Sequence, residues 1–295
     1  MKKFLFLLML LCACMFTVNG TALAAPGDDI GWYWISSDDK YTKSYAPVEV
    51  KVEKYSDNHV PCLIKAITKT GYSFGGAKET LENYGLKDIQ PTRLSYSIAT
   101  VLVNPQQRTM AYVDEVFYDS AGQELWSNSS QNLKYKEINS QEFDEDFYVY
   151  IVDTVFGMGE VERSKADDRW LMLWQKTDKD GGTVHSMADT TTMRFHDDDN
   201  LIYWEWQEVK NPQGAVTEIR FQKKAVNLPQ ETEKIVRYMH WGSQGWQDLT
   251  ESDTDGNYHA ITKNSEGYEA LTRLRVYEGD YEPWVTRYSL TSRMK

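Results

Sequence analysis

The segment Tyr118–Ser130 reads YDSAGQELWSNSS, and the later segment His240–Ser252 reads HWGSQGWQDLTES. Both place serine and glycine in a turn that is flanked by aromatic residues. Aligning Val103–Ile138 with Val226–Ile261 requires no gap, the offset is constant at 123 residues, and ten of the 36 positions are identical. Because the turn residues fall in register with the flanking valines, composition alone does not explain the match. We infer a tandem duplication of one domain.

The duplication extends upstream of this segment. The stretch WISSDDKYTKSYA, which begins at Trp34, resembles WQKTDKDGGTVHSMA, which begins at Trp174, at an offset of 140 residues. The first copy therefore contains about 17 additional residues, and we expect them within Gly71–Lys87. This insertion should carry a short helix over Ala77–Tyr84 that ends at Gly85.

The residue patterns within each copy predict its secondary structure. Alternating apolar and polar residues indicate antiparallel strands, and Asp, Asn and Gly between them indicate hairpin turns. Each copy ends in a predicted helix: one begins near Asn139, where Glu142 completes a capping box, and the other begins near Ser265. The sequence therefore predicts an α+β fold, mostly antiparallel β. Two tandem small domains should each form an antiparallel sheet with a packed C-terminal helix.

The domain boundaries follow from the same alignment. We expect a first β-rich repeat domain at residues 28–157 and a second at residues 169–290. Between them, residues 158–168 are charged and show no apolar period, so we interpret this segment as a linker.

The N-terminal segment has the features of a signal peptide. Two lysines precede an apolar run over 4–18, and the A-x-A pattern that ends at Ala24 suits a signal peptidase. We therefore expect residues 1–24 to be removed by cleavage between Ala24 and Ala25, and no membrane span to remain afterwards. A lipoprotein anchored at the LCAC sequence of residues 11–14 is the alternative. Either form is extracytoplasmic: periplasmic, on the cell surface or secreted.

Charge and cysteine content restrict the partners. The net charge is −12, and loss of the two lysines at positions 2 and 3 makes it −14. A chain this acidic is repelled by phosphate backbones and by anionic lipid, so we expect no nucleic-acid partner and no direct adsorption to a membrane. After cleavage Cys62 is the only cysteine, so no intramolecular disulfide can form. Its apolar context, HVPCLIKAI, predicts a buried and inert free thiol.

Motifs for catalysis and metal binding are absent from the sequence. It contains no nucleophile elbow, zinc-protease motif, phosphate-binding loop or paired-cysteine metal site. The acidic clusters 196–200 and 253–257 lack the ligand frame of a calcium loop, and turn propensity explains both. The second copy's histidines show no metal-ligand spacing. We identify no catalytic residue and expect no cofactor or metal, which favours a protein that is not an enzyme.

Tryptophans distinguish the two copies. Trp241 and Trp246 flank the turn of the second copy, where the first copy has Tyr118 and Gln123. Because the fold does not require these tryptophans, and because tryptophan is enriched at binding sites, we predict that Trp241, Trp246 and the neighbouring His240 bind a ligand. The alternative is that the two tryptophans stack across the hairpin and stabilise it.

The order of these signals resembles the surface-adhesin protein E-like family of small secreted bacterial domains. The residues that carry the resemblance are an opening tryptophan (Trp34, Trp174), the turn at 118–122, and a tyrosine ahead of the closing helix (Tyr135, Tyr258). The resemblance implies a mostly antiparallel sheet with a packed C-terminal helix. It also implies binding to extracellular matrix or host proteins.

Together these observations favour a secreted or cell-envelope, non-enzymatic binding or adhesin-like protein, with a host-matrix or envelope protein as partner. One alternative is a structural or assembly protein of the envelope whose sheet edges pair with each other. A second is a secreted hydrolase, which requires two carboxylates that converge in a cleft with perturbed pKa values.

Overall fold

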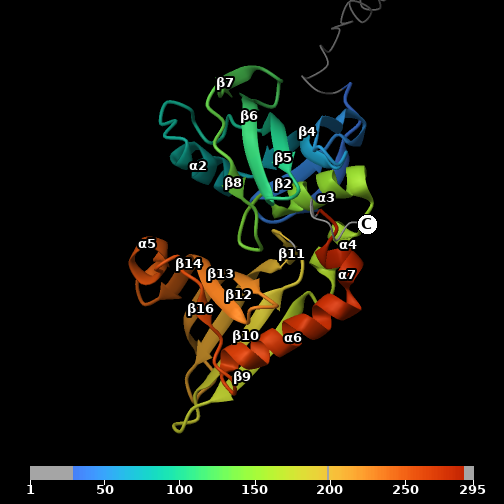
Figure 1. The fold of residues 1–295 in the computed structure, drawn as a ribbon. Helices are drawn as coiled ribbons and strands as arrows, with labels where there is room; N and C mark the ends of the chain where they lie inside the picture. The colour runs from blue at the N-terminus through green and yellow to red at the C-terminus, as the bar shows by residue number, and fades with distance from the viewer. Residues whose placement is uncertain (1–28, 198, 289–295) are drawn as a thin grey trace, which may run out of the picture.

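The computed structural model describes residues 29–197 and 199–288, which form two similar halves (Figure 1). The strands of the first sheet are β1 (Tyr33–Ser37), β2 (Tyr41–Tyr45), β3 (Lys51–Tyr55), β4 (Pro61–Tyr72), β5 (Tyr96–Asn104), β6 (Thr109–Tyr118), β7 (Glu124–Ser129) and β8 (Lys136–Glu137). Those of the second are β9 (Trp170–Thr177), β10 (Thr183–Asp189), β11 (Arg194–Phe195), β12 (Asn200–Lys210), β13 (Val216–Asn227), β14 (Thr232–Gly242), β15 (Gly245–Asp248) and β16 (His259–Ala260).

Short helices join and cover these strands. They are η1 (Pro47–Glu49), α2 (Phe74–Asn83), α3 (Glu145–Phe156), α4 (Glu160–Lys165), α5 (Thr250–Asp253), α6 (Glu266–Asp280) and α7 (Glu282–Val285). Within the described part of the chain, none of the helices is long and apolar enough to cross a bilayer. The predicted signal peptide, with its cleavage site at Ala24 and Ala25, lies outside the described residues.

The two sheets have the same strand order, which confirms the predicted fold class. The first runs β1-β2-β4-β5-β6-β7 and the second runs β9-β10-β12-β13-β14-β15. The remaining strands also correspond, because β3 pairs with β4 as β11 pairs with β12, and β8 pairs with β6 as β16 pairs with β14. Every pairing is antiparallel. The chain therefore contains one domain architecture twice.

The repeated glycine explains why the same turn recurs. Gly122 follows β6 and Gly245 begins β15, and their φ angles are 76° and 75°. Residues with a Cβ rarely adopt this left-handed region, whereas glycine enters it without steric cost. Each copy therefore keeps a glycine where its hairpin reverses direction.

A second repeated turn precedes β6 and β14. Asn104 accepts hydrogen bonds from the backbone N–H groups of residues 106 and 107, and Asn227 accepts one from residue 230. Four residues after each asparagine, Arg108 and Glu231 have φ angles of 51° and 54°. The backbone conformation is thus preserved even where the side chain is not.

The upstream alignment predicted from the sequence is wrong by two residues. The pairing register shifts at Ile35 in β1 and at Leu173 in β9, and both side chains are buried in their cores. These two residues therefore correspond, so Trp34 corresponds to Met172 and not to Trp174. The two tryptophans match in residue type, but the pairing register places them at non-equivalent positions of β1 and β9.

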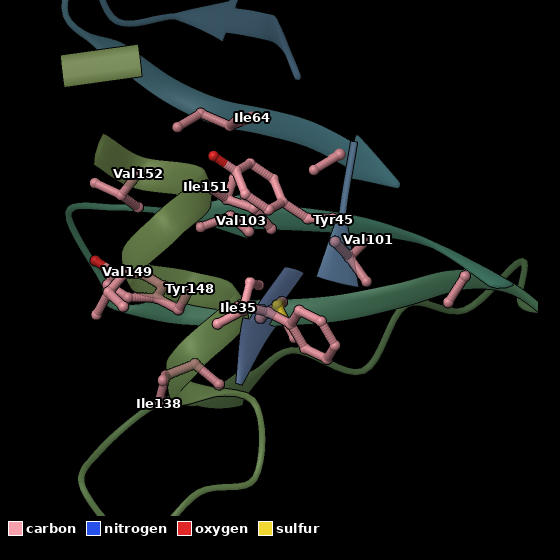
Figure 2. Close-up of a cluster of buried hydrophobic side chains, with 14 of the residues drawn as sticks. Ile35, Tyr45, Ile64, Val101, Val103, Ile138, Tyr148, Val149, Ile151 and Val152 are labelled. Atoms are coloured by element: carbon pink, nitrogen blue, oxygen red, sulfur yellow. The ribbon is translucent and has the colours of Figure 1, made fainter. Parts of the chain in front are cut away.

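Each core forms between one sheet face and one long helix. Figure 2 shows α3 lying across the first sheet, and the buried cluster between them includes Ile151, Val152, Ile64 and Val103. In the second half α6 packs on β9 and its neighbours through Leu271 and other apolar side chains. The predicted helix start at Ser265 is confirmed, since its side chain caps α6 by accepting from the N–H of residue 268.

The first helix starts later than the sequence predicts. Residues Asn139 and Glu142 form a turn, in which the N–H of Glu142 donates to the carbonyl oxygen of Asn139 at 3.1 Å. The helix α3 itself begins at Glu145. The capping-box pattern was therefore satisfied by a turn ahead of the helix.

The insertion in the first copy is confirmed. Between β4 and β5 the chain forms α2, whereas the equivalent connection between β12 and β13 is a short hairpin turn at 211–215. The helix buries Ala77 and Leu81 against Leu94 and Phe117. Its N-cap is Ser73, whose hydroxyl accepts from the N–H of residue 76.

A buried polar network joins the two halves. Glu160, in α4 within the predicted linker 158–168, is fully buried and receives the Arg287 guanidinium at 2.7 Å and the Tyr288 hydroxyl at 2.8 Å. Arg108 lies 3.6 Å from the same carboxylate and also donates to the carbonyl oxygen of Thr191. Figure 1 shows α4 and α7 between the two sheets. The halves are therefore held together by ion pairs that are shielded from water.

Replacing Glu160 should weaken the whole protein. We expect Glu160→Gln to lower the free energy of unfolding by about 3 kcal/mol, because removal of one charge from a buried ion-pair cluster leaves its partners uncompensated. Chemical denaturation measures the change, and Glu162→Gln, on the exposed side of the same helix, serves as the control. Equal unfolding midpoints for the two variants would contradict this role of Glu160.

Candidate ligand-binding site

A cavity of about 420 Å³ opens in the first half, between α2 and the start of α3. Both helices lie on the same face of the sheet. Val101 of β5 packs under α3, and Ser97, four residues earlier in the same strand, has its side chain on the same face. Ser97 pairs with Phe117, which packs under α2. In Figure 1, α2 lies at the left of that half and α3 at its right. The gap between them is the cavity, and its lining includes Tyr41, Tyr72, Tyr84, Tyr112, Glu115 and Asp144. We call it the tyrosine pocket.

A β-bulge brings two lining residues of β6 to the same face. Glu115 and Tyr112 are three residues apart, so regular alternation would place them on opposite faces. The register between β5 and β6 skips Val113, which is the extra residue of the bulge. Val236, its counterpart in β14, is skipped in the same way. The bulge therefore belongs to the repeated fold, and the first copy uses it to aim two polar side chains into the pocket.

Glu115 is the most deeply buried acidic group on the floor next to α2. The residue is only 7% exposed. The Tyr84 hydroxyl donates a hydrogen bond to its carboxylate, and Ser97 is a second hydrogen-bond partner. The Ser97 hydroxyl also lies 2.8 Å from the Tyr72 hydroxyl. A chain of hydroxyl groups therefore surrounds this carboxylate.

Burial dominates the acid–base behaviour of the floor. It raises the pKa of Glu115, the hydrogen bonds from Tyr84 and Ser97 lower it in part, and the negative charge of Asp144 raises it further. Burial likewise raises the pKa of Tyr72, Tyr84 and Tyr112. The phenols therefore stay protonated at neutral pH and can donate hydrogen bonds.

The opposite wall of the pocket contains a lysine that is paired with two carboxylates. Asp144, which is 2% exposed, accepts a hydrogen bond from the Tyr112 hydroxyl at 2.7 Å. The Lys136 ammonium lies 3.0 Å from Asp144 and 2.9 Å from Glu142. Burial lowers the pKa of Lys136, but the charge of Asp144 and the hydrogen bonds outweigh this and raise it. This lysine is therefore a cation held in a fixed position.

Aromatic rings form much of the remaining wall. The Tyr41 ring meets Phe143 edge-on with centroids 4.9 Å apart, and it meets Tyr72 in the same way at 6.0 Å. Tyr84 packs on Phe117 at 5.2 Å. Such edge-to-face contacts hold neighbouring rings at steep angles to one another. The pocket thus combines aromatic walls with a few converging polar groups, which is the usual composition of a small-molecule site.

The structure brings together two of the three residues predicted to bind a ligand. Trp241 and Trp246 are cross-strand partners of β14 and β15, so their side chains share one face. His240 is directed to the other face, where its ring lies 3.4 Å from the Glu218 carboxylate. Trp246 is 44% exposed, and its ring contacts Trp206 of β12 at a centroid distance of 6.0 Å.

The Trp246 side chain also faces the first half. It lines a second cavity, of about 260 Å³, together with Arg237 and Met239 of its own half and Asn139 and Gln141 of the first half. The hairpin of β14 and β15 therefore lies next to the first half of the protein. Ligand binding by Trp241, Trp246 and His240 stays a prediction.

Cys62 is a free thiol, as expected, but it is not buried. The residue is half-exposed at the start of β4, and its sulfur lies 3.5 Å from the carbonyl oxygen of Lys54. The apolar sequence around it predicted burial because the neighbouring Ile64 does enter the core. The pairing register between β3 and β4 skips Cys62, so the regular alternation that would give it the face of Ile64 is interrupted there.

The sequence analysis missed the tyrosine pocket, although it located the insertion that builds one wall. The signal that could have revealed it is Glu115. This charged residue lies between Val113 and Phe117 in an alternating strand pattern that predicts an inward-facing side chain. For the residues with defined positions, no group of three His, Cys, Asp or Glu side chains is placed to hold a metal ion.

Comparison with known proteins gives no match: neither a family model nor a curated protein is similar to this chain. Membership of the surface-adhesin protein E-like family therefore stays a prediction based on the sequence motifs.

The raised pKa of Glu115 makes a prediction about pH. The folded protein binds a proton at this carboxylate more tightly than the unfolded chain does. Its contribution to stability is therefore fully present below the unfolded pKa and is lost as the pH rises through the folded pKa. Glutamine imitates the protonated form. The free energy of unfolding of Glu115→Gln, measured relative to the wild type, should therefore increase as the pH rises from about 4 to about 7.

Urea denaturation at the two pH values measures this difference. The exposed Glu53→Gln variant is the control, and its stability relative to the wild type should not gain in the same way. If Glu115→Gln instead loses stability relative to the wild type towards neutral pH, the carboxylate has a counter-charge that the structure does not record.

Proposed function

We propose that the protein is a non-enzymatic binding protein that acts outside the cytoplasm, and that the tyrosine pocket is its ligand site. The observation that carries this proposal is the convergence of tyrosine hydroxyl groups and a buried carboxylate on one cavity of about 420 Å³. A cavity of this size takes a small organic group. That group is either a free molecule or a chemical group displayed by a larger host-matrix or envelope partner.

Comparison of the two halves supports a specialised role for the pocket. At the constant offset, Glu115 corresponds to Tyr238 and Tyr112 corresponds to Ile235. The second half also lacks an equivalent of α2. Both halves nevertheless form the same sheet, so the topology of the sheet does not depend on these residue types. Residues that a duplicated domain keeps without a folding role are candidates for function.

The extracytoplasmic location and the adhesin-like role are proposed on separate grounds. The signal-peptide features of residues 1–24 support the location. The adhesin-like role is supported by the resemblance of each copy to small secreted adhesin domains.

A second candidate function is hydrolysis by a pair of carboxylates. The observation that favours it is that Glu115, whose pKa is raised by burial, and Asp144 line the same pocket. The observation against it is that Asp144 is already held by Tyr112 and Lys136, which leaves it poorly placed to activate water. Recovery of a pocket ligand in cleaved form after incubation with the wild type, but intact with Glu115→Gln, would favour the hydrolase over the binding protein.

A variant that fills the pocket tests the proposed function. Thr80 of α2 lines the pocket, whereas Lys78 of the same helix is exposed to solvent. We expect Thr80→Trp to abolish the binding of small organic compounds in a ligand-observed NMR screen that covers cations, sugars and organic acids. Lys78→Trp should bind as the wild type does, and circular dichroism confirms that both variants are folded.

The screen can also refute the proposal. If the compounds that bind the wild type bind Thr80→Trp equally well, their site lies elsewhere. If no compound class binds the wild type, the pocket is not a small-molecule site.

A further inference from the structure

The acidic residues of the tyrosine pocket differ in their counter-charges. Glu79 is paired with Lys40 at 2.6 Å, and Asp144 is paired with Lys136 at 3.0 Å. Glu115 is bound by hydroxyl groups, and the charged residue that acts on it is Asp144, which is also negative. Among the described residues, no lysine or arginine forms an ion pair with Glu115. Glu115 is therefore a buried acid of the pocket that has no protein cation in the described part of the chain as its partner.

The second half accommodates a buried glutamate in another way. Glu205 is fully buried on the helix-covered face of the second sheet. The Lys224 ammonium lies 2.8 Å from its carboxylate, and the Ser186 hydroxyl donates to it at 2.5 Å. Burial raises the pKa of Glu205, but Lys224 outweighs this and holds it below the usual range. A buried glutamate in one half thus has a lysine beside it, whereas Glu115 has an open cavity.

The chemistry of the walls fits a cation. A desolvated ammonium is attracted both by a carboxylate and by the faces of aromatic rings within about 6 Å. The protein already uses this attraction at the rim, where the Lys43 ammonium lies 4.0 Å from the centre of the Phe143 ring. The tyrosine hydroxyls can bind the Glu115 carboxylate while their rings remain part of the wall. A lysine in their place would fill the cavity and neutralise the carboxylate.

We propose that the ligand of the tyrosine pocket carries an organic ammonium group, and that Glu115 is its counter-charge. The proposal rests on the proposed function, because it names the chemical class of ligand for the same pocket. The net charge of −12 favours the approach of cations to the protein. The ammonium group belongs either to a free small molecule or to the exposed end of a larger molecule.

Matched pairs of probes test the charge separately from the shape. Choline is compared with its neutral analogue in which carbon replaces the nitrogen, and propylammonium is compared with propanol. We expect at least one cation to bind about tenfold or more tightly than its neutral partner by isothermal titration calorimetry. Binding should weaken with added salt, because the attraction is between charges.

Variants identify the counter-charge. Glu115→Gln keeps the shape of the side chain and should remove the preference for the cation, so that the two members of a pair bind alike. Glu82→Gln changes an exposed glutamate of α2 and should retain the preference. Thermal unfolding of both variants confirms that they are folded before the titrations are compared.

The outcomes separate this inference from the proposed function. If neutral compounds bind as tightly as the cations and Thr80→Trp abolishes that binding, the pocket is a ligand site but the ammonium inference is wrong. If the cations bind but Glu115→Gln leaves their preference intact, Glu115 is not the counter-charge. If neither choline nor propylammonium binds the wild type, the inference is overturned.

Discussion

The helix α3 crosses the strands on which it packs and covers only part of their length, and the pocket is a consequence of this. A helix with its side chains is about 10 Å wide, whereas the 12 residues of β4 span about 40 Å. A single helix therefore leaves one end of the inner sheet face open to water. In the first half the inserted α2 covers part of that end, and the tyrosine pocket is the space that remains between the two helices.

The second half has the same geometry and closes the uncovered end differently. Its inner face carries Glu205 and Lys224, whose ion pair is supported by Ser186 and Gln207. Buried ion pairs contribute little net stability, but they satisfy groups that would otherwise be costly to bury. The contrast suggests a division of labour after duplication: one copy filled this space with its own charges, and the other kept it available. The buried network around Glu160 then fixes the two copies together.

Much of the fold could be predicted from the sequence because local chemistry determines it. The glycines at 122 and 245 and the asparagines at 104 and 227 set turn conformations by themselves, and Ser265 caps its helix. The pocket could not be predicted, because the bulge at Val113, which brings Tyr112 to the same face as Glu115, is shown by no local pattern. Likewise the capping-box residues Asn139 and Glu142 form a turn, and α3 begins only at Glu145.

The central claim is that Glu115 is a buried carboxylate whose counter-charge comes from the ligand. The most direct measurement is the pKa of the Glu115 carboxyl group, followed by carbon-13 NMR with and without saturating choline. The account predicts a raised pKa in the free protein and a fall in this pKa when choline binds, because a bound cation favours the charged carboxylate. A pKa that stays the same while choline binds would contradict it.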